Sequence, residues 1–225
     1  MPREIFDRQI RQLQDEVLLL GSMVEQFTLG AVDAFKRREP ETARKLYENN
    51  VLINEKRFAI ENAIIILMAT QQRMAHDLRL MAAMLEVITE LERMGDYAKG
   101  ICKVTVMLAK SDIEIPVKEF SRMTELGVSM LHRALGAFIS ENVNLATYIP
   151  NEDDEVDELY NTIYRKIVDE MMANPKIIDH ANLLLWVAHN LERLADRVIN
   201  ICERIVFIST GELYEIDSTD DEMEG

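Results

Sequence analysis

Apolar residues recur along two long stretches of the chain in alternating steps of three and four positions. One stretch carries Leu184, Val187, Leu191, Leu194, Val198, Ile201, Ile205 and Ile208, and the other carries Leu80, Met84, Val87, Leu91, Met94, Ala98, Ile101, Thr105 and Leu108. This spacing gathers the apolar side chains on one face of an α-helix. Each stripe therefore predicts a long helix that packs in an antiparallel bundle at a crossing angle of about 20°.

Helix-breaking residues divide the chain into six long helical segments. Proline disfavours a helical residue before it but suits the first position of a helix, so Glu39-Pro40 and Asn174-Pro175 each mark a boundary. The first predicted helix ends near Arg38. The other five run from Pro40 to about Thr70, from about Met74 to Lys110, from about Val117 to Glu141, from about Glu152 to Ala173, and from Pro175 to about Gly211.

The chain contains an internal repeat of about 100 residues. The motif Leu91–Asp96 matches Leu191–Asp196, and farther upstream Ile53–Glu55 matches Val156–Glu158 at a slightly larger offset. Similar segments in the same order indicate duplication. We therefore predict an all-α fold of two tandem homologous three-helix bundles.

The predicted domains follow from this repeat. The first three-helix bundle covers residues 1–110 and the second covers residues 117–211, with a linker at residues 111–116. Residues 212–225 hold seven acidic residues and no basic one, a composition that predicts a disordered acidic tail.

The net charge of −15 narrows the possible partners. Binding to nucleic acid or to anionic lipid requires clustered basic residues, so neither is expected. The N-terminus shows no hydrophobic signal region, and the apolar run Ala63–Ala69 is far shorter than the roughly 20 residues that span a membrane. These features predict a cytoplasmic protein without direct membrane insertion.

Two pairs of acidic residues occupy equivalent places in the two halves. Glu92 and Asp96 lie one helical turn apart, as do Glu192 and Asp196, and all four are expected on the outward side of their helices. Like charges at this spacing destabilise a helix by roughly 0.2–0.5 kcal/mol, so a neutralising group is expected. On the predicted helix that carries Glu192 and Asp196, His189 is the one candidate partner for these acids.

A further pair, Asp153 and Asp157, lies on the preceding predicted helix. If the last two helices are antiparallel neighbours, the two pairs can converge. Carboxylate oxygens are hard ligands that suit Mg²⁺, Ca²⁺, Mn²⁺ or iron. The pattern is also typical of a solvated helix surface that binds nothing, and the spacing alone does not separate these two readings.

The residues around the acidic pairs resemble a known family. Glu90–Asp96 and Asn190–Asp196 are similar to the two signatures of the PhoU family, and His76–Arg79 resembles the segment that precedes the first signature. The resemblance extends over residues 1–213. It implies two tandem three-helix bundles whose acidic motifs pair across adjacent helices and bind metal, in some members as iron clusters.

Carried onto this chain, the resemblance implies metal sites of unequal strength. The second-half set is complete, with Glu192 and Asp196 facing Asp153 and Asp157. In the first half, Glu92 and Asp96 would face Asn50 and Asn54, which are neutral, so that site is expected to be weaker or empty. The implied cofactor is a metal ion, with iron as the first candidate and Mg, Mn, Zn or Ca as alternatives.

The resemblance also implies a role. PhoU proteins are negative regulators of phosphate uptake and of the phosphate-starvation response, and they link the ATPase of a phosphate ABC transporter to a sensor histidine kinase without catalysis. A homodimer is a separate expectation, because the amphipathic helices are predicted to expose a second apolar edge that includes Ile199 and Val206.

Three alternatives remain open at the level of sequence. The chain could serve another transporter with the same fold, it could be a carboxylate-bridged metalloenzyme, or it could be a structural bundle without an ion. The expected outward position of the acidic pairs argues against the enzyme, since such a centre needs an interior cluster.

Overall fold

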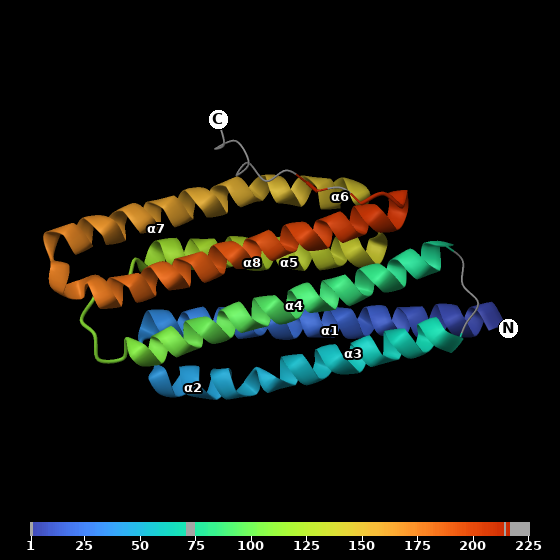
Figure 1. Ribbon diagram of the computed structural model, residues 1–225, viewed down its shortest axis with the longest axis horizontal. Helices are drawn as coiled ribbons and strands as arrows, with labels where there is room; N and C mark the ends of the chain where they lie inside the picture. Colours follow the sequence, from blue (N-terminus) through green and yellow to red (C-terminus); the bar gives the residue numbers. More distant parts are fainter. Residues whose placement is uncertain (1, 71–74, 214, 217–225) are drawn as a thin grey trace.

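The computed structural model describes residues 2–70, 75–213 and 215–216. Helices dominate this part of the chain, and Figure 1 shows them as long, nearly parallel rods. The elements are α1 (Pro2–Arg37), α2 (Pro40–Asn49), α3 (Val51–Thr70), α4 (Ala75–Met107), α5 (Val117–Ser140), α6 (Val143–Tyr148), η1 (Ile149–Glu152), α7 (Asp153–Ala173), η2 (Pro175–Ile177) and α8 (Ile178–Thr210).

The prediction of two tandem three-helix bundles is confirmed. The first half consists of α1, the α2–α3 pair and α4, and the second consists of α5, the α6–α7 pair and α8. Two details differ from the sequence prediction. The second predicted helix is divided at Asn50 into α2 and α3, and the short helix α6 precedes α7. The Asn142 side chain starts α6 by accepting a 3.1 Å hydrogen bond from the Leu145 backbone N–H.

The two halves share one core. Helix α4 packs on α8 and α1 packs on α5, and a single cluster of buried apolar side chains runs through both halves. Cys102 and Cys202 are buried in this cluster, as small apolar packers would be, and burial raises the pKa of each thiol to about 12.

The apolar edge expected to form a dimer contact is not available. Ile199 and Val206 are both buried within the chain. The periodicity of α8 marks both as apolar positions, and α8 is packed against α4, α5, α6 and α7, so it has no second apolar edge at these residues. The prediction of a dimer through these two residues is therefore wrong.

Helix α1 stands out for its length and hydropathy. Within the described residues it is the one helix long and apolar enough to cross a membrane by those two measures alone. Half of its most apolar window is buried inside the chain, as in the core helix of a water-soluble bundle.

The linker and the described part of the tail both contact the helical bundle. Residues 111–116 form no helix, and the Arg38 guanidinium donates hydrogen bonds to the backbone carbonyls of Ser111 and Ile113. Most of the predicted acidic tail, at residues 214 and 217–225, lies outside the described residues. Ile216 packs against the core, and its backbone N–H donates a 3.0 Å hydrogen bond to Glu203 Oε1.

Candidate functional site

The second-half carboxylates lie where α7 packs on α8. A short connection at η2 turns the chain back on itself, so these two helices are antiparallel. The Tyr160 ring of α7 lies 6.4 Å from the His189 ring of α8, measured between centroids, which sets the register. Asp157 precedes Tyr160 by about one turn and Glu192 follows His189 by one turn, so both lie at one level of the helix pair. Burial raises the pKa of Tyr160, and the charge of Glu192 raises it further.

The same register brings Asp153 of α7 to the level of Asp196 of α8. Asp153 is buried, whereas Glu192 and Asp196 are half-buried rather than fully outward. His189 Nδ1 lies 3.1 Å from Glu192 Oε2, which is the partner that the sequence suggested. Arg197 NH2 lies 3.9 Å from Asp196 Oδ2, a contact that the sequence analysis missed. The α7–α8 face therefore collects four acidic side chains beside two basic ones.

The first half has the same frame with neutral residues on one side. Asn50, at the α2–α3 junction, is 1% exposed and donates a hydrogen bond from Nδ2 to Asp96 Oδ1 at 3.2 Å. Asp96 itself is exposed and Glu92 is half-buried, so the predicted outward position holds for Asp96 alone among the four motif acids. The amide of Asn50 thus occupies the place that a second carboxylate takes in the other half.

At the α2–α3 side of the first half, two amide oxygens are buried without a hydrogen-bond partner. They are Asn50 Oδ1 and Asn54 Oδ1. Carbonyl oxygens of this kind are acceptable ligands for Ca²⁺ or Mg²⁺, and an unsatisfied buried acceptor costs free energy. Together with Glu92 and Asp96, they give the first half a donor set of hard oxygens.

The donor chemistry of both halves fits a hard metal ion, whereas the present side-chain positions do not form a compact cluster. Across the described ranges, no group of three or more His, Cys, Asp or Glu side chains is arranged to hold a metal ion. Residues Asp153, Asp157, Glu192 and Asp196 would be the ligands in the second half, and Glu92, Asp96 and Asn54 in the first. Metal binding at either set stays a prediction.

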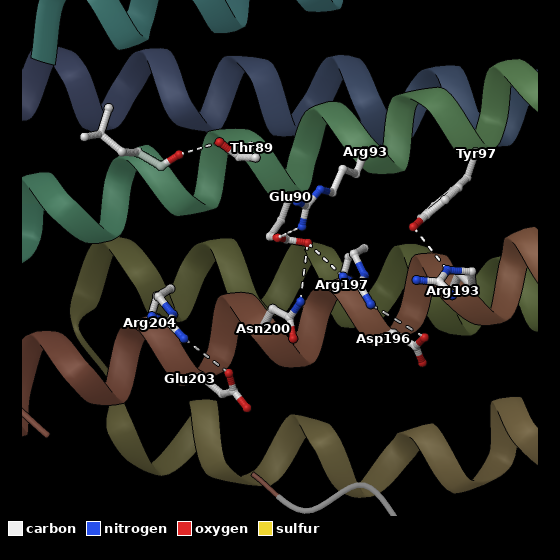
Figure 2. A network of polar contacts seen from close by, with 11 residues as sticks. Thr89, Glu90, Arg93, Tyr97, Arg193, Asp196, Arg197, Asn200, Glu203 and Arg204 are labelled. Carbon is white, nitrogen blue, oxygen red and sulfur yellow. Dashed lines mark hydrogen bonds and ion pairs between the residues drawn. The ribbon is translucent and has the colours of Figure 1, made fainter. Parts of the chain in front are cut away.

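A polar network joins the two halves at the α4–α8 contact, where the sequence analysis assigned no function (Figure 2). Glu90 of α4 is buried, and its carboxylate lies 2.6 Å from Arg93 NH1 and 3.6 Å from Arg197 NH1. Asn200 donates a 3.4 Å hydrogen bond to the same carboxylate. Arg197 therefore lies between Glu90 of the first half and Asp196 of the second.

The two motif arginines behave differently. Arg93 pairs with Glu90, three residues before it on the same helix. Arg193 instead donates a 3.2 Å hydrogen bond from Nε to the Tyr97 hydroxyl and lies 5.9 Å from the centre of that ring. Since Tyr97 belongs to α4 and Arg193 to α8, this contact is a second polar link between the halves.

Gly100 explains one difference between the repeats. The equivalent residue in the second half is Asn200, which uses its side chain to reach Glu90. A Cβ atom on Gly100 would lie 2.3 Å from the ring of Trp186, so the absence of a side chain makes room for the indole. Trp186 of α8 therefore packs against α4 at Gly100 while 44% of it stays exposed.

The sequence held a signal for the missed network. Glu90 lies three residues after Val87 and four before Met94, so it falls on the buried flank of the α4 stripe. An acidic residue at such a position requires a partner. Arg197, which stands in the second repeat where Tyr97 stands in the first, is the basic residue on the facing helix.

Comparison with known proteins matches both halves to one family. The model of the PhoU domain matches residues 17–105 and again residues 120–205. A relative from Clostridium acetobutylicum, named as a phosphate-specific transport system accessory protein PhoU homolog, is 30% identical over 218 residues, which is 96% of this chain and 100% of the relative. The PhoU accessory protein of Escherichia coli strain K12 is 30% identical over 92% of this chain and 86% of its own length.

Solved structures agree with the fold. The crystal structure of the phosphate transport system regulatory protein PhoU from Streptococcus pneumoniae superposes with a TM-score of 0.86 and 30% identity, and covers 93% of this chain and 99% of that one. The crystal structure of PhoU from Pseudomonas aeruginosa gives a TM-score of 0.85 and 27% identity, over 92% of this chain and 100% of that one.

Proposed function

The chain belongs to the PhoU family, and from this premise we propose that it is the accessory protein of a phosphate-specific transport system and restrains phosphate uptake. The observation that carries the proposal is the match of both halves to the family, together with relatives of nearly the same length that are named as accessory proteins of phosphate-specific transport. Because the alignments cover nearly the whole of this chain and most of each relative, the similarity concerns the complete fold and not one shared domain.

The proposed action is that of a cytoplasmic adaptor without catalysis. In the proposal, the chain contacts the ATPase of the phosphate ABC transporter and a sensor histidine kinase, and represses the phosphate-starvation response when phosphate is plentiful. A long bundle with one continuous core is a rigid body suited to bridging two partners. The strongly acidic surface favours partner surfaces that are basic.

We further propose that the α7–α8 carboxylates bind a metal ion and that occupancy changes how the adaptor docks. Support comes from the shared register of the two helices and from the ion-pair chain that leads from Asp196 through Arg197 to Glu90. A cation near Asp196 would compete with Arg197 for that carboxylate. The competition would alter the link between the halves at the α4–α8 contact.

The function is tested by deleting the gene in its host and measuring uptake of labelled phosphate in phosphate-rich medium. We expect uptake and a phosphate-starvation reporter to rise on deletion, and both to return to the original level when the gene is restored. Unchanged uptake in the deletion strain would contradict the proposal. A change in the uptake of another substrate, with phosphate unaffected, would assign the chain to a different transporter.

The kinase link is tested separately with the same reporter. In a strain that lacks both the chain and the kinase, we expect the reporter to stay low, because the kinase is needed for the response. A reporter that stays high without the kinase would remove the kinase from the proposal and leave the transporter role standing.

A further inference from the structure

Basic residues follow the last part of α4 and the turn after it. From Tyr97 to Lys110 the chain carries three lysines and no acidic residue, although its net charge is −15. Of these lysines, Lys103 is exposed and Lys99 is half-buried. An acidic partner is therefore attracted to this part of a molecule whose overall charge repels it.

Aromatic side chains flank these lysines on both sides of α4. The Nζ atom of Lys99 lies 5.2 Å from the centre of the Tyr47 ring of α2. On the α8 side, the Trp186 ring lies over Gly100, which stands between the two lysines in sequence. Tyr47 and Trp186 are each 44% exposed. Tryptophan and tyrosine beside basic residues are typical of the positions that contribute most to protein–protein binding.

A hollow of about 230 Å³ lies between α2 and α4 beside the same lysines. Its lining combines apolar residues with two basic residues and one acid: Tyr47, Val106 and Met107, then Arg44 and Lys103, then Glu48. Such a hollow can take one apolar side chain of a partner while the lysines contact carboxylates next to it. We call this surface the α2–α4 groove; it comprises the hollow together with Lys99.

In the second half, the chain itself contacts the equivalent position. Lys103 corresponds to Glu203 in the repeat, and Glu203 Oε1 accepts a 3.0 Å hydrogen bond from the backbone N–H of Ile216. The Ile216 side chain packs against the core. In the first half, Tyr47, Lys103 and Met107 stay exposed, so no described segment of the chain covers the α2–α4 groove in this way. The repeat thus provides a covered and an uncovered version of one surface.

We propose that the α2–α4 groove binds an acidic segment of a partner protein, which places one apolar side chain in the hollow and carboxylates beside Lys99 and Lys103. The difference in charge between the halves supports this occupant. Glu203 accepts a hydrogen bond from a backbone N–H, whereas Lys103 can only donate and needs an acceptor. Carboxylates are the strongest acceptors that a polypeptide offers. The inference rests on the proposed adaptor function only for the identity of the partner.

The width of the basic surface favours a polypeptide segment over an anionic lipid surface. Acidic residues border the groove, because Asp96 is exposed on α4 just before Lys99 and Glu48 belongs to the lining of the hollow. A broad lipid surface would approach these acids together with the lysines and would be repelled by them. A narrow segment can contact the lysines and avoid both acids.

The test uses the fact that Trp186 is the one tryptophan in the sequence. A full-length chain labelled with fluorotryptophan gives a single fluorine NMR signal, at the edge of the groove. This chain is titrated with a synthetic peptide in which glutamates flank a central isoleucine. We expect the signal to shift as the peptide binds, and affinity to fall about tenfold or more between about 0.05 and about 0.5 M NaCl. A peptide with lysine in place of each glutamate is the matched control, and it should leave the signal unchanged.

The variant Lys99→Glu/Lys103→Glu reverses the charge of the groove. It is expected to bind the glutamate peptide about tenfold more weakly or worse, with unchanged helicity by circular dichroism. Arg44 is left in place because it already pairs with Glu41. If this variant loses helicity, Lys103→Gln takes its place, since it changes one exposed side chain and should weaken binding in the same direction.

The matched control for the charge change is Arg8→Glu/Arg11→Glu. Both arginines are exposed and lie near the N-terminus, at the other end of the bundle from the start of α2 (Figure 1). The variant alters the net charge by the same amount, so its affinity for the glutamate peptide is expected to stay within about twofold of the wild type.

Several results would overturn the inference. They are the absence of a shift with the glutamate peptide, an equal shift with the lysine peptide, and equal affinities of the two double variants. A signal that moves with vesicles containing phosphatidylserine, but not with the glutamate peptide, would make the occupant a lipid surface.

The same label distinguishes this inference from the proposed function. If the purified transporter ATPase or the cytoplasmic part of the kinase binds the chain without moving the signal, and the variant Lys99→Glu/Lys103→Glu binds it equally well, the adaptor function stands and the groove is contradicted. If the glutamate peptide moves the signal and neither protein binds, the groove stands and the adaptor function is contradicted.

Discussion

The two halves of the chain share a backbone frame and differ in where they carry charge. On the inner side, α7 presents Asp153 and Asp157 to the α8 acids, whereas the equivalent positions in the first half are Asn50 and Asn54. On the outer surface, the large exposed side chains of α3 are apolar, whereas many exposed side chains of α7 are charged. The same three-helix frame therefore supports a candidate ion site in one half and an exposed apolar helix surface in the other.

This comparison separates what the frame requires from what each half does. Buried apolar positions agree between the halves, as with Leu91 and Leu191 or Cys102 and Cys202, because the core must be filled. Positions at the helix edges differ because packing does not constrain them. Differences at the edges are thus better guides to function than agreements in the core.

The largest predicted effect on stability comes from giving α4 the residue that α8 carries at the equivalent position of the α4–α8 contact. The residue equivalent to Glu90 is Asn190, so Glu90→Asn removes the buried carboxylate that faces Arg93 and Arg197. We expect the free energy of unfolding to fall by about 3 kcal/mol, because Arg197 keeps its charge in a largely buried place. Urea denaturation followed by circular dichroism measures the change.

The control for this variant is Glu86→Asn, which alters an exposed residue one turn earlier on α4. Its expected effect is within about 0.5 kcal/mol. Equal effects of the two substitutions would show that the polar network does not hold the halves together.

A smaller effect on stability is expected when Asn50 of the first half is replaced by aspartate, the residue at the equivalent position of the second half. Asn50→Asp replaces a 3.2 Å hydrogen bond to Asp96 with repulsion between two carboxylates. We expect a loss of about 2 kcal/mol at pH 7. Burial and the charge of Asp96 raise the pKa of the new carboxyl above its unfolded value. The loss is therefore fully present when both states are ionised, and it shrinks as the pH falls through the raised pKa.

Added Mn²⁺ at neutral pH is expected to reduce the same loss, since a cation neutralises the repulsion. The matched control is Asn49→Asp, which introduces the same charge at the exposed neighbouring residue. If the stability loss of Asn50→Asp changed neither with pH nor with added Mn²⁺, it would contradict the electrostatic explanation of this site.

The smallest expected difference is between the two cysteines. Both thiols are buried, and burial raises both pKa values to about 12, so neither should react with a maleimide at pH 8 while the chain is folded. Because one core runs through both halves, we expect Cys102 and Cys202 to become reactive at the same urea concentration. Pulsed labelling followed by peptide mass spectrometry reads each site. Earlier labelling of Cys102 would show that the first half unfolds independently.

The sequence predicted the frame well because the frame rests on periodicity and on prolines. Six long helices and the repeat followed from positions such as Leu91 and Leu191 and from breakers such as Pro40 and Pro175. The division at Asn50 and the short α6 were missed, since both depend on local backbone turns that the apolar pattern does not encode. The repeat pointed to the acidic pairs of α4 and α8, the helix order to Asp153 and Asp157, and the family resemblance to Asn54. Their metal binding stays a prediction.

Periodicity does not predict which helices contact one another in the folded chain. The stripe of α8 marks Ile199 and Val206 as apolar but does not say which neighbour covers them, so the predicted dimer edge was wrong. The same limit hid the Glu90 network, whose members come from two helices about 100 residues apart in sequence. The exposure of apolar side chains on α3, such as Phe58 and Ile66, was missed because an exposed and a buried apolar helix have similar composition.

The central claim is that the two halves differ in their ability to bind a metal ion, and metal content tests it most directly. Purified wild-type chain would be compared by mass spectrometry with Asp153→Asn/Asp157→Asn, which copies the first half, and with Glu192→Ala/Asp196→Ala. The account predicts bound metal in the wild type, and loss of most of it in both variants with unchanged helicity. Equal metal content in all three chains, whether near zero or not, would contradict the claim.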